Sequence, residues 1–421
     1  MPYSILLMKK ILVTSFLSTF IFTCGWAQTN GNAPAVSDPH QGHNHGHSHG
    51  LNSAPDAATI QADPHAGHNH GNAAHGSNPP STGDPQNSPT NLTPAAEVHL
   101  KNIRQLTFGG DNAEAYFSPN SKSITFQSNF KQWGVECDQI FTAPIDKLGK
   151  DSAFKPAMVS TAWGRTTCSY YMPNNKHILY ATTHFANKAC PPVPASNGAY
   201  VWAIYSDFDI VVADKKGKIV KRLTDAPGYD AEATVSPDGK KIVYTSTKSG
   251  DLELWVMDID GKNDKQVTFG LGYDGGAFFS PDSKKLVFRA SRPKTSADSS
   301  KYLDLLSKNL VEPTNMEIYT VNIDGTGLKQ VTNLGKANWA PFYHPSGKKI
   351  VFSSNHHSKR GYNFDLFMIN EDGTGLEQIT NQSIFNAFPM FSPDGKHLIF
   401  SSNRNNGGGR DTNLFLADWV D

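Results

Sequence analysis

The stretch Tyr229–Gly261, YDAEATVSPDGKKIVYTSTKSGDLELWVMDIDG, contains the unit that decides the fold. An apolar run ends at Ser236–Gly239 (SPDG), where proline sets the first turn position and glycine accepts a positive φ. Lys241–Ser246 and Glu253–Ile259 then follow as β-branched and aromatic runs. Lys265–Thr268 supplies one more short run. The pattern therefore predicts a four-stranded antiparallel meander, which is the blade of a β-propeller.

The same pattern occurs six times along the chain. The proline that follows the first strand of each repeat recurs at Pro119, Pro173, Pro237, Pro281, Pro345 and Pro393. The sixth repeat has no fourth strand of its own, whereas Gln105–Thr107 precedes the first turn with no repeat before it. We therefore predict an all-β fold, a six-bladed β-propeller over residues 101–421, closed by an N-terminal strand in the last blade.

Two phrases carry a resemblance to a known family. Phe279–Phe288 (FSPDSKKLVF) and Ile323–Thr332 (IDGTGLKQVT) resemble the WD40-like PD40 repeat of TolB-type six-bladed propellers. The resemblance covers nearly all of residues 101–421 and implies the propeller fold. In this superfamily TolB binds other proteins, and related propellers occur in prolyl oligopeptidase-type enzymes and in some polysaccharide lyases. TolB carries an α/β domain ahead of its propeller, and here a histidine-rich segment takes that place.

The start of the chain predicts export. Lys9 and Lys10 precede the apolar stretch Ile11–Thr23, which ends at Gly25–Ala27 with small residues at the positions that a signal peptidase reads. We predict a signal peptide over residues 1–27 and a periplasmic protein, with a lipoprotein acylated on Cys24 or a secreted protein as alternatives. The apolar stretch is too short to span a membrane, so any membrane association is expected to be peripheral.

Charge excludes one class of partner. The chain has 38 basic and 38 acidic residues, so it has no basic footprint for nucleic acid. The 35 glycines and 26 prolines suit a turn-rich all-β protein. The sequence leaves the oligomeric state open.

Residues 28–100 form a low-complexity segment that we expect to be disordered, because it has too few apolar residues to offset the entropy of ordering. The phrase Asp38–Gly46 (DPHQGHNHG) recurs as Asp63–Gly71 (DPHAGHNHG). Imidazoles on a flexible chain bind Zn²⁺, Cu²⁺ or Ni²⁺, so the predicted metal ligands are His40, His43, His45, His47, His49, His65, His68, His70 and His75. The alternative is a polar tether whose histidines bind no metal.

The loops that join each fourth strand to the next first strand surround one end of the central channel. Polar residues recur there, and the predicted ligand-binding residues are Asn112, Glu114, Thr166, Asp230, Glu232, Asp274, Asn338, Trp339 and Asn386. Cys168, Gly276, Ala340 and Phe388 occupy the position of Glu114 and Glu232 in the other blades. The alternative is that Asn, Asp and Thr only cap their own turns.

A second polar column begins the third strands, at Gln139, Asp209, Glu253, Glu317, Asp365 and Asn413. We expect a structural role for it, in hydrogen bonds to the ends of second strands such as Asn129, Arg289, Asn355 and Asn403.

Insertions crowd the face that carries these loops. In residues 293–314, Tyr302, Leu305 and Leu306 recur at helical spacing behind Ser296 and Asp298, which predicts a short amphipathic helix that acts as a lid or covers exposed core. After signal cleavage three cysteines remain, so at most one internal disulfide forms. We expect Cys168–Cys190, with Cys137–Cys168 as the alternative.

Two functions remain open. The first is an exported, non-enzymatic propeller that binds an envelope protein or peptide through its loop-rich face, with the histidine-rich segment as a metal-binding arm. The second is a metal-assisted hydrolase or lyase on a carbohydrate or peptide, which uses the carboxylates listed above with His184 or His356.

Overall fold

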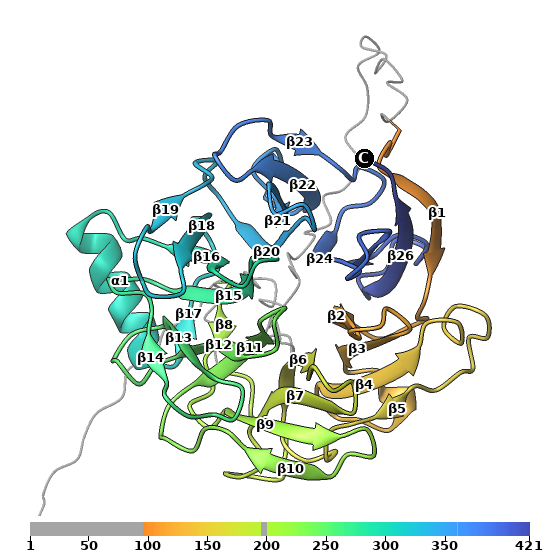
Figure 1. Cartoon of the computed structure of the whole chain (residues 1–421), viewed down its shortest axis with the longest axis horizontal. Coiled ribbons are helices and arrows are strands. Elements are labelled where there is room, and N and C mark those ends of the chain that lie inside the picture. The colour runs from red at the N-terminus through yellow and green to blue at the C-terminus, as the bar shows by residue number, and fades with distance from the viewer. Residues whose placement is uncertain (1–95, 195–199, 360) are drawn as a thin grey trace, which may run out of the picture. The chain divides into compact units, whose positions relative to one another are not determined.

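The computed structural model describes residues 96–194, 200–359 and 361–421. The predicted signal peptide and the nine predicted metal-ligating histidines lie outside these residues. In the described part of the chain, six four-stranded antiparallel sheets and one two-stranded sheet are present. The six larger sheets are arranged around a central axis, with β2, β6, β11, β15, β20 and β24 innermost (Figure 1). The predicted six-bladed propeller is confirmed.

Each blade is a meander from the axis outward. Blade one contains β2 (Asn112–Phe117), β3 (Ser123–Ser128), β4 (Gln139–Pro144) and β5 (Ala157–Met158). Blade two contains β6 (Thr166–Tyr171), β7 (His177–Thr182), β9 (Asp209–Asp214) and β10 (Ile219–Arg222). Blade three contains β11 (Asp230–Val235), β12 (Lys241–Ser246), β13 (Glu253–Asp258) and β14 (Lys265–Gln266).

The second half of the ring repeats this order. Blade four contains β15 (Asp274–Phe279), β16 (Lys285–Ser291), β18 (Met316–Asn322) and β19 (Lys329–Gln330). Blade five contains β20 (Asn338–Tyr343), β21 (Lys349–Ser354), β22 (Asp365–Asn370) and β23 (Glu377–Gln378). Blade six contains β24 (Asn386–Phe391), β25 (His397–Ser402), β26 (Asn413–Trp419) and, outermost, β1 (Leu100–Gln105).

Strand β1 joins the two ends of the described chain in one sheet. It runs antiparallel to β26, with Gln105 opposite Phe415 and Leu100 opposite Trp419. The outer edge of blade six is therefore supplied by the residues that precede blade one. This pairing covers an edge of β26 that would otherwise be open to another chain.

The turns between first and second strands follow directly from their sequence. In blade three, Pro237 begins the turn and Gly239 has φ of 71°, in the left-handed region that glycine adopts without strain. The Ser236 hydroxyl donates to Asp238 at 2.6 Å and accepts from the backbone N–H of Lys241 at 2.9 Å. We call the side of the propeller that carries these six turns the hairpin face, and the opposite side the loop face.

Every first strand contains a β-bulge at the same place. In blade three the register shifts between Ala231 and Thr234, and Glu232 has φ of 57°. The equivalent residues with positive φ are Glu114, Cys168, Glu232, Gly276, Ala340 and Phe388. Because a bulge turns one extra side chain out of the pleat, it can direct that side chain toward the axis.

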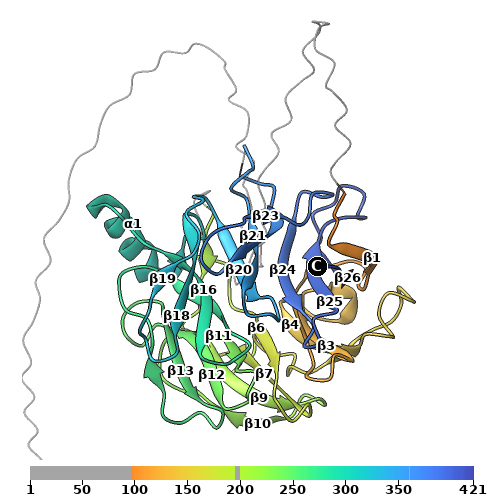
Figure 2. The same cartoon turned by 45° about the horizontal axis from the view of Figure 1, so that its top comes forward.

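The insertions of blades two and four pair with each other on the loop face. Strand β8 (Trp202–Ala203) runs antiparallel to β17 (Leu310–Val311). Helix α1 (Ser296–Ser307) lies at the edge of the ring, on the left of both views (Figures 1 and 2). Thr295 and Asp298 form a capping box at its start, and its buried residue is Tyr302. The predicted helix is present, and it covers core at the edge of the ring. The other short element is the 3₁₀ helix η1 (Lys131–Trp133).

Candidate binding site in the propeller channel

The six bulge residues converge on the axis. Together they line one small cavity of about 20 Å³, to which Arg289 and Tyr116 also contribute. This volume is about that of one water molecule. The middle of the channel is therefore filled with side chains. Those from blades one to four include the polar residues Glu114, Cys168, Glu232 and Arg289.

A buried ion pair fills most of this polar region. The guanidinium of Arg289 forms an ion pair with Glu232, and both residues are less than 5% exposed. Glu232 also accepts hydrogen bonds from the Tyr273 hydroxyl at 2.7 Å, from Thr245 at 2.7 Å and from the backbone N–H of Gly276 at 2.9 Å. The position of Gly276 has no room for a side chain, because a Cβ there would overlap the Arg289 guanidinium. Blades three and four are thus joined at the axis.

Cys168 is a buried cysteine beside this pair and is not part of the disulfide. Burial raises its pKa well above the usual value, and the nearby carboxylates of Glu114 and Glu232 raise it further. A thiol held in its neutral form is a poor nucleophile and a poor metal ligand. The disulfide joins Cys137 and Cys190, so the expected Cys168–Cys190 pair and its alternative Cys137–Cys168 are wrong. The bulge turns Cys168 toward the axis, whereas the other two cysteines lie in the loops after second strands.

Aromatic rings lie on both sides of the polar region of the channel. Toward the hairpin face, Tyr116 and Phe278 lie 5.6 Å apart by ring centroids, and Phe278 lies 5.1 Å from Phe342. Toward the loop face, the Trp202 ring from the blade-two insertion lies over Arg289 at 5.1 Å and 5.0 Å from Trp339. The loop-face end of the channel is therefore covered by the insertions.

The predicted ligand-binding residues are shielded from solvent. All nine are buried, with exposed fractions of 4% or less: Asn112, Glu114, Thr166, Asp230, Glu232, Asp274, Asn338, Trp339 and Asn386. Trp339 donates from Nε1 to the carbonyl of Pro313 at 2.8 Å. The structure brings Glu114 and Glu232 together at the axis with Cys168. Ligand binding by this set would require the cover to move, and it stays a prediction.

The other column residues join neighbouring blades. Asn386 donates to Asp365 at 2.9 Å, and Asn338 donates to Glu317 at 3.2 Å. The third-strand column also accepts from fourth-strand hydroxyls, as Glu253 does from Thr268 at 2.6 Å. The expected structural role of that column is confirmed, but its partners are these residues, whereas Asn355 and Asn403 accept from the backbone of Ala337 and Phe385.

Burial changes the ionisation of several of these carboxyl groups. It raises the pKa of Glu253 to about 8 and that of Asp230 to about 6. Glu253 also shares a hydrogen bond with Asp274, whose pKa is raised by burial although the Arg292 guanidinium beside it favours the charged form. Near pH 7 the protonated form of Glu253 is therefore favoured, and it donates a hydrogen bond to Asp274.

The histidines proposed for catalysis lie in separate blades. His184 Nδ1 is 2.8 Å from the Thr182 hydroxyl, and His356 Nδ1 is 2.9 Å from the Ser354 hydroxyl. Burial lowers the pKa of both. In residues 96–194, 200–359 and 361–421, no group of three or more His, Cys, Asp and Glu side chains is arranged to hold a metal ion.

The channel is open at the hairpin face. A cavity of about 410 Å³ lies there, within the range of ligand-binding pockets. Its rim is formed by the six repeat prolines, Pro119, Pro173, Pro237, Pro281, Pro345 and Pro393, of which all but Pro345 are exposed. Aromatic side chains line its wall: Phe117, Tyr170, Tyr171, Phe279, Phe342, Tyr343 and Phe391. We call this cavity the funnel.

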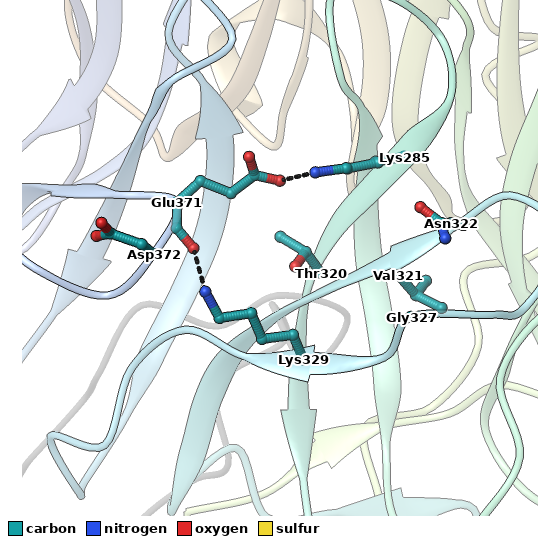
Figure 3. A pocket seen from close by; sticks show the side chains of 8 residues that line it. All are labelled: Lys285, Thr320, Val321, Asn322, Gly327, Lys329, Glu371 and Asp372. Atoms are coloured by element: carbon teal, nitrogen blue, oxygen red, sulfur yellow. Dashed lines mark hydrogen bonds and ion pairs between the residues drawn. The ribbon is translucent and has the colours of Figure 1, made fainter.

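A smaller cavity of about 190 Å³ lies between blades four and five near the same face. Its charged groups are paired: Lys285 Nζ is 2.7 Å from the Glu371 carboxylate, and Lys329 donates to the Glu371 carbonyl at 3.2 Å (Figure 3). Tyr343 also donates to Glu371, at 3.2 Å. The residues around this cavity therefore connect blade four to blade five.

Sequence reasoning missed Arg289 as a channel residue, and it did not point to the cavity at the hairpin face. Arg289 appeared only as a partner for the third-strand column. The six prolines were recognised as turn residues, but their common distance from the axis was not used. Because each proline follows an innermost strand, the six prolines surround the channel. The repeat pattern of the sequence already implies this position.

Comparison with known proteins agrees with the fold. The profile of the TolB beta propeller domain (PD40) matches residues 194–310 and 293–410, which together cover more than half of the chain. The chain belongs to the TolB β-propeller family. No curated protein matches it in sequence.

One solved structure supports the same fold, and two others give lower similarity. A TolB-type structure from Agrobacterium tumefaciens aligns with a TM-score of 0.50 and 18% identity, over 76% of this chain and 97% of that one. TolB from Acinetobacter baumannii aligns with a TM-score of 0.45 and 20% identity, over 74% of this chain and 64% of that one. An oligogalacturonate lyase in complex with manganese gives a TM-score of 0.39 at 13% identity, over 76% and 90%, and carries no argument about activity. In the described residues no domain precedes the propeller, and no helix has the length and apolar character to cross a bilayer.

Proposed function

We propose that this protein is an exported binding module of TolB type that holds a protein partner from the cell envelope at its funnel. The observation that carries the proposal is the open, aromatic-walled cavity on the axis at the hairpin face. Concave apolar surfaces with a rigid frame are the usual place for an anchoring side chain of a partner. Membership of the TolB family supports a protein partner in general.

The hairpin face replaces the loop-rich face as the proposed binding surface. On the loop face, the blade-two insertion covers the channel with Trp202, which packs against Trp339 of β20, and both rings are 3% exposed or less. On the hairpin face, short turns leave the channel open. A partner can therefore reach the axis from one side without any rearrangement of the described residues.

The export signal and the histidine-rich arm complete the proposal. The basic and apolar pattern of residues 1–27 supports export to the periplasm. The arm, residues 28–100, is proposed to bind Zn²⁺, Cu²⁺ or Ni²⁺ through the nine histidines from His40 to His75, because neutral imidazole is a good ligand for these ions.

A blocking label on the funnel rim tests the proposal. Pro281→Cys places a thiol on the exposed rim, and a bulky maleimide dye attached there would obstruct the funnel. Phe269→Cys, in the loop between β14 and β15 on the loop face, is the matched control because Phe269 is 66% exposed. We expect the labelled P281C protein to lose partners that the unlabelled protein recovers from envelope extract, and labelled F269C to keep them.

Two results would count against the proposal. If the protein recovers no more partners from envelope extract than an unrelated propeller does, the proposed protein-binding function is wrong. If labelled F269C loses its partners and labelled P281C keeps them, the binding surface is on the loop face.

A further inference from the structure

Each turn on the hairpin face carries one exposed lysine three residues after its rim proline. These lysines are Lys122, Lys176, Lys240, Lys284, Lys348 and Lys396. Because each is fixed to a rim proline by the same short turn, the six form a ring around the funnel. We call this set the lysine ring.

The lysine ring differs from the structural lysines next to it. Lys241 and Lys285, one residue further along, are paired with Asp258 at 2.6 Å and Glu371 at 2.7 Å. Among the described residues, Lys240 is the one ring member in an ion pair, at 3.7 Å from Asp238. In blades three and four, a lysine in an ion pair with a third-strand or neighbouring-blade carboxylate is thus preceded by an exposed lysine.

The six turns around the funnel carry fewer carboxylates than ring lysines. They contribute Asp238, Asp282 and Asp394, each of which accepts from the serine hydroxyl of its own turn at 2.6 Å. The turns between third and fourth strands add carboxylates on the same face, among them Asp260 and Glu371, which pair with Lys262 at 3.2 Å and with Lys285 at 2.7 Å. Within the six turns themselves, the ring lysines therefore outnumber the carboxylates. Like charges gathered around one apolar opening attract an oppositely charged ligand and repel one another.

We propose that the hairpin face binds an acidic segment of a protein partner, with an aromatic or large aliphatic side chain in the funnel and carboxylates against the lysine ring. This inference rests on the proposed function and names the chemistry of the partner. The funnel supplies the apolar anchor site, and the ring supplies long-range attraction and orientation.

A peptide fits this surface better than an anionic membrane. Peripheral binding to a bilayer requires apolar side chains that project into it. None of the large apolar side chains that are exposed in the described residues belongs to the six turns around the funnel, where the apolar surface is recessed; Leu328 and Leu376 are exposed on the same face, in turns between third and fourth strands. A narrow projecting side chain can enter such a cavity, whereas a lipid surface cannot follow its walls.

Charge reversal in alternate blades tests the inference with the full chain. The ring variant is K176E/K284E/K396E, and the control K131E/K294E/K359E makes the same charge change at exposed lysines in loops of the other face. The probes are a fluorescein-labelled peptide of glutamates around one tryptophan, its all-glutamine analogue, and a glutamate peptide with glycine in place of tryptophan. Vesicles containing phosphatidylglycerol are the membrane probe.

We expect the glutamate–tryptophan peptide to bind the wild type and the control variant, and to bind the ring variant at least about tenfold more weakly. Binding should weaken between about 0.1 M and about 1 M salt, where the screening length falls from about 10 Å to about 3 Å. The glutamine and glycine peptides should each bind more weakly than the parent peptide.

Equal binding of the peptide by the ring and control variants would overturn the inference. So would ring-dependent binding of the vesicles in the absence of peptide binding, or a ring-dependent dimer of this chain at the same concentrations. Envelope partners that the ring variant recovers as well as the wild type does would overturn the acidic-partner inference and leave the proposed function intact. Recovery of no partner by the wild type would remove the proposed function itself.

Discussion

Arg289 and Glu232 form a buried ion pair that joins blades three and four at the axis of the propeller. The pair is completed by the Tyr273 hydroxyl, which donates to Glu232 and accepts from Arg289 at 2.6 Å. The Trp202 ring over the guanidinium excludes water from the loop-face side. The burial of a charge is tolerated here because Glu232 and the Tyr273 hydroxyl lie within hydrogen-bonding distance of the guanidinium, although Arg289 Nε has no partner among the described residues.

The first prediction concerns this pair. Glu232→Ala should destabilise the protein by about 3–5 kcal/mol, because it leaves the Arg289 charge buried without its counter-ion. Glu312→Ala removes the carboxylate of an exposed pair with Lys301 and should cost less than about 1 kcal/mol. Urea denaturation measures both. Equal losses would show that Arg289 finds another partner, and the double variant E232M/R289M should recover part of the loss.

The second prediction concerns pH. Glu253 has a folded-state pKa of about 8, raised by burial from the ordinary value of 4.5. Its contribution to stability is therefore full below about pH 4.5 and is lost as the pH rises through about 8. Asp230, with a pKa raised to about 6, also makes the protein less stable as the pH rises, over a lower pH range. We expect the melting temperature to fall between about pH 5 and about pH 9.

Glu253→Gln identifies the group responsible. The neutral amide mimics the protonated carboxyl, so the fall in melting temperature with pH should become shallower. Glu312→Gln, at the exposed pair, should leave the slope unchanged. A slope that is the same in E253Q and the wild type would assign the pH dependence to other groups.

The third prediction concerns the disulfide. Cys137 and Cys190 are 53 residues apart in the chain, so their bond restricts the unfolded chain substantially. Reduction should lower the free energy of unfolding by about 2–4 kcal/mol in the wild type. The melting temperature of C137S/C190S should not respond to reductant, whereas C168S should respond as the wild type does. Loss of the response in C168S would restore the pairing expected from the sequence.

The fourth prediction concerns the arm. Replacement of the nine histidines from His40 to His75 with glutamine in the full chain should abolish tight binding of Zn²⁺, Cu²⁺ or Ni²⁺, measured by calorimetry. The melting temperature of the metal-free propeller should stay the same, because these histidines lie outside the propeller repeats. Binding that persists in this variant would place the metal on the propeller.

The fold was predictable because its signals are local and repeated. Pro237 and Gly239 specify a turn through their own backbone preferences, and the same turn recurs in the other blades. The site was less predictable. Glu232 was identified as a polar residue near the axis, but its partner Arg289 is 57 residues away and is brought to it by the packing of blade four against blade three. The disulfide was missed for the same reason, since no local pattern distinguishes Cys137 from Cys168.

The sequence by itself determined the six repeats, the strands and turns within them, and hence the propeller, because periodicity and turn chemistry act over a few residues. It also contains the lysine ring, at a constant distance from each proline. Only the tertiary structure decided which end of the channel is open. That outcome depends on the pairing of β8 with β17, two insertions from different blades, and on the aromatic rings that this pairing places over Arg289. Contacts between segments so far apart in the chain arise when the ring assembles, and no single repeat encodes them.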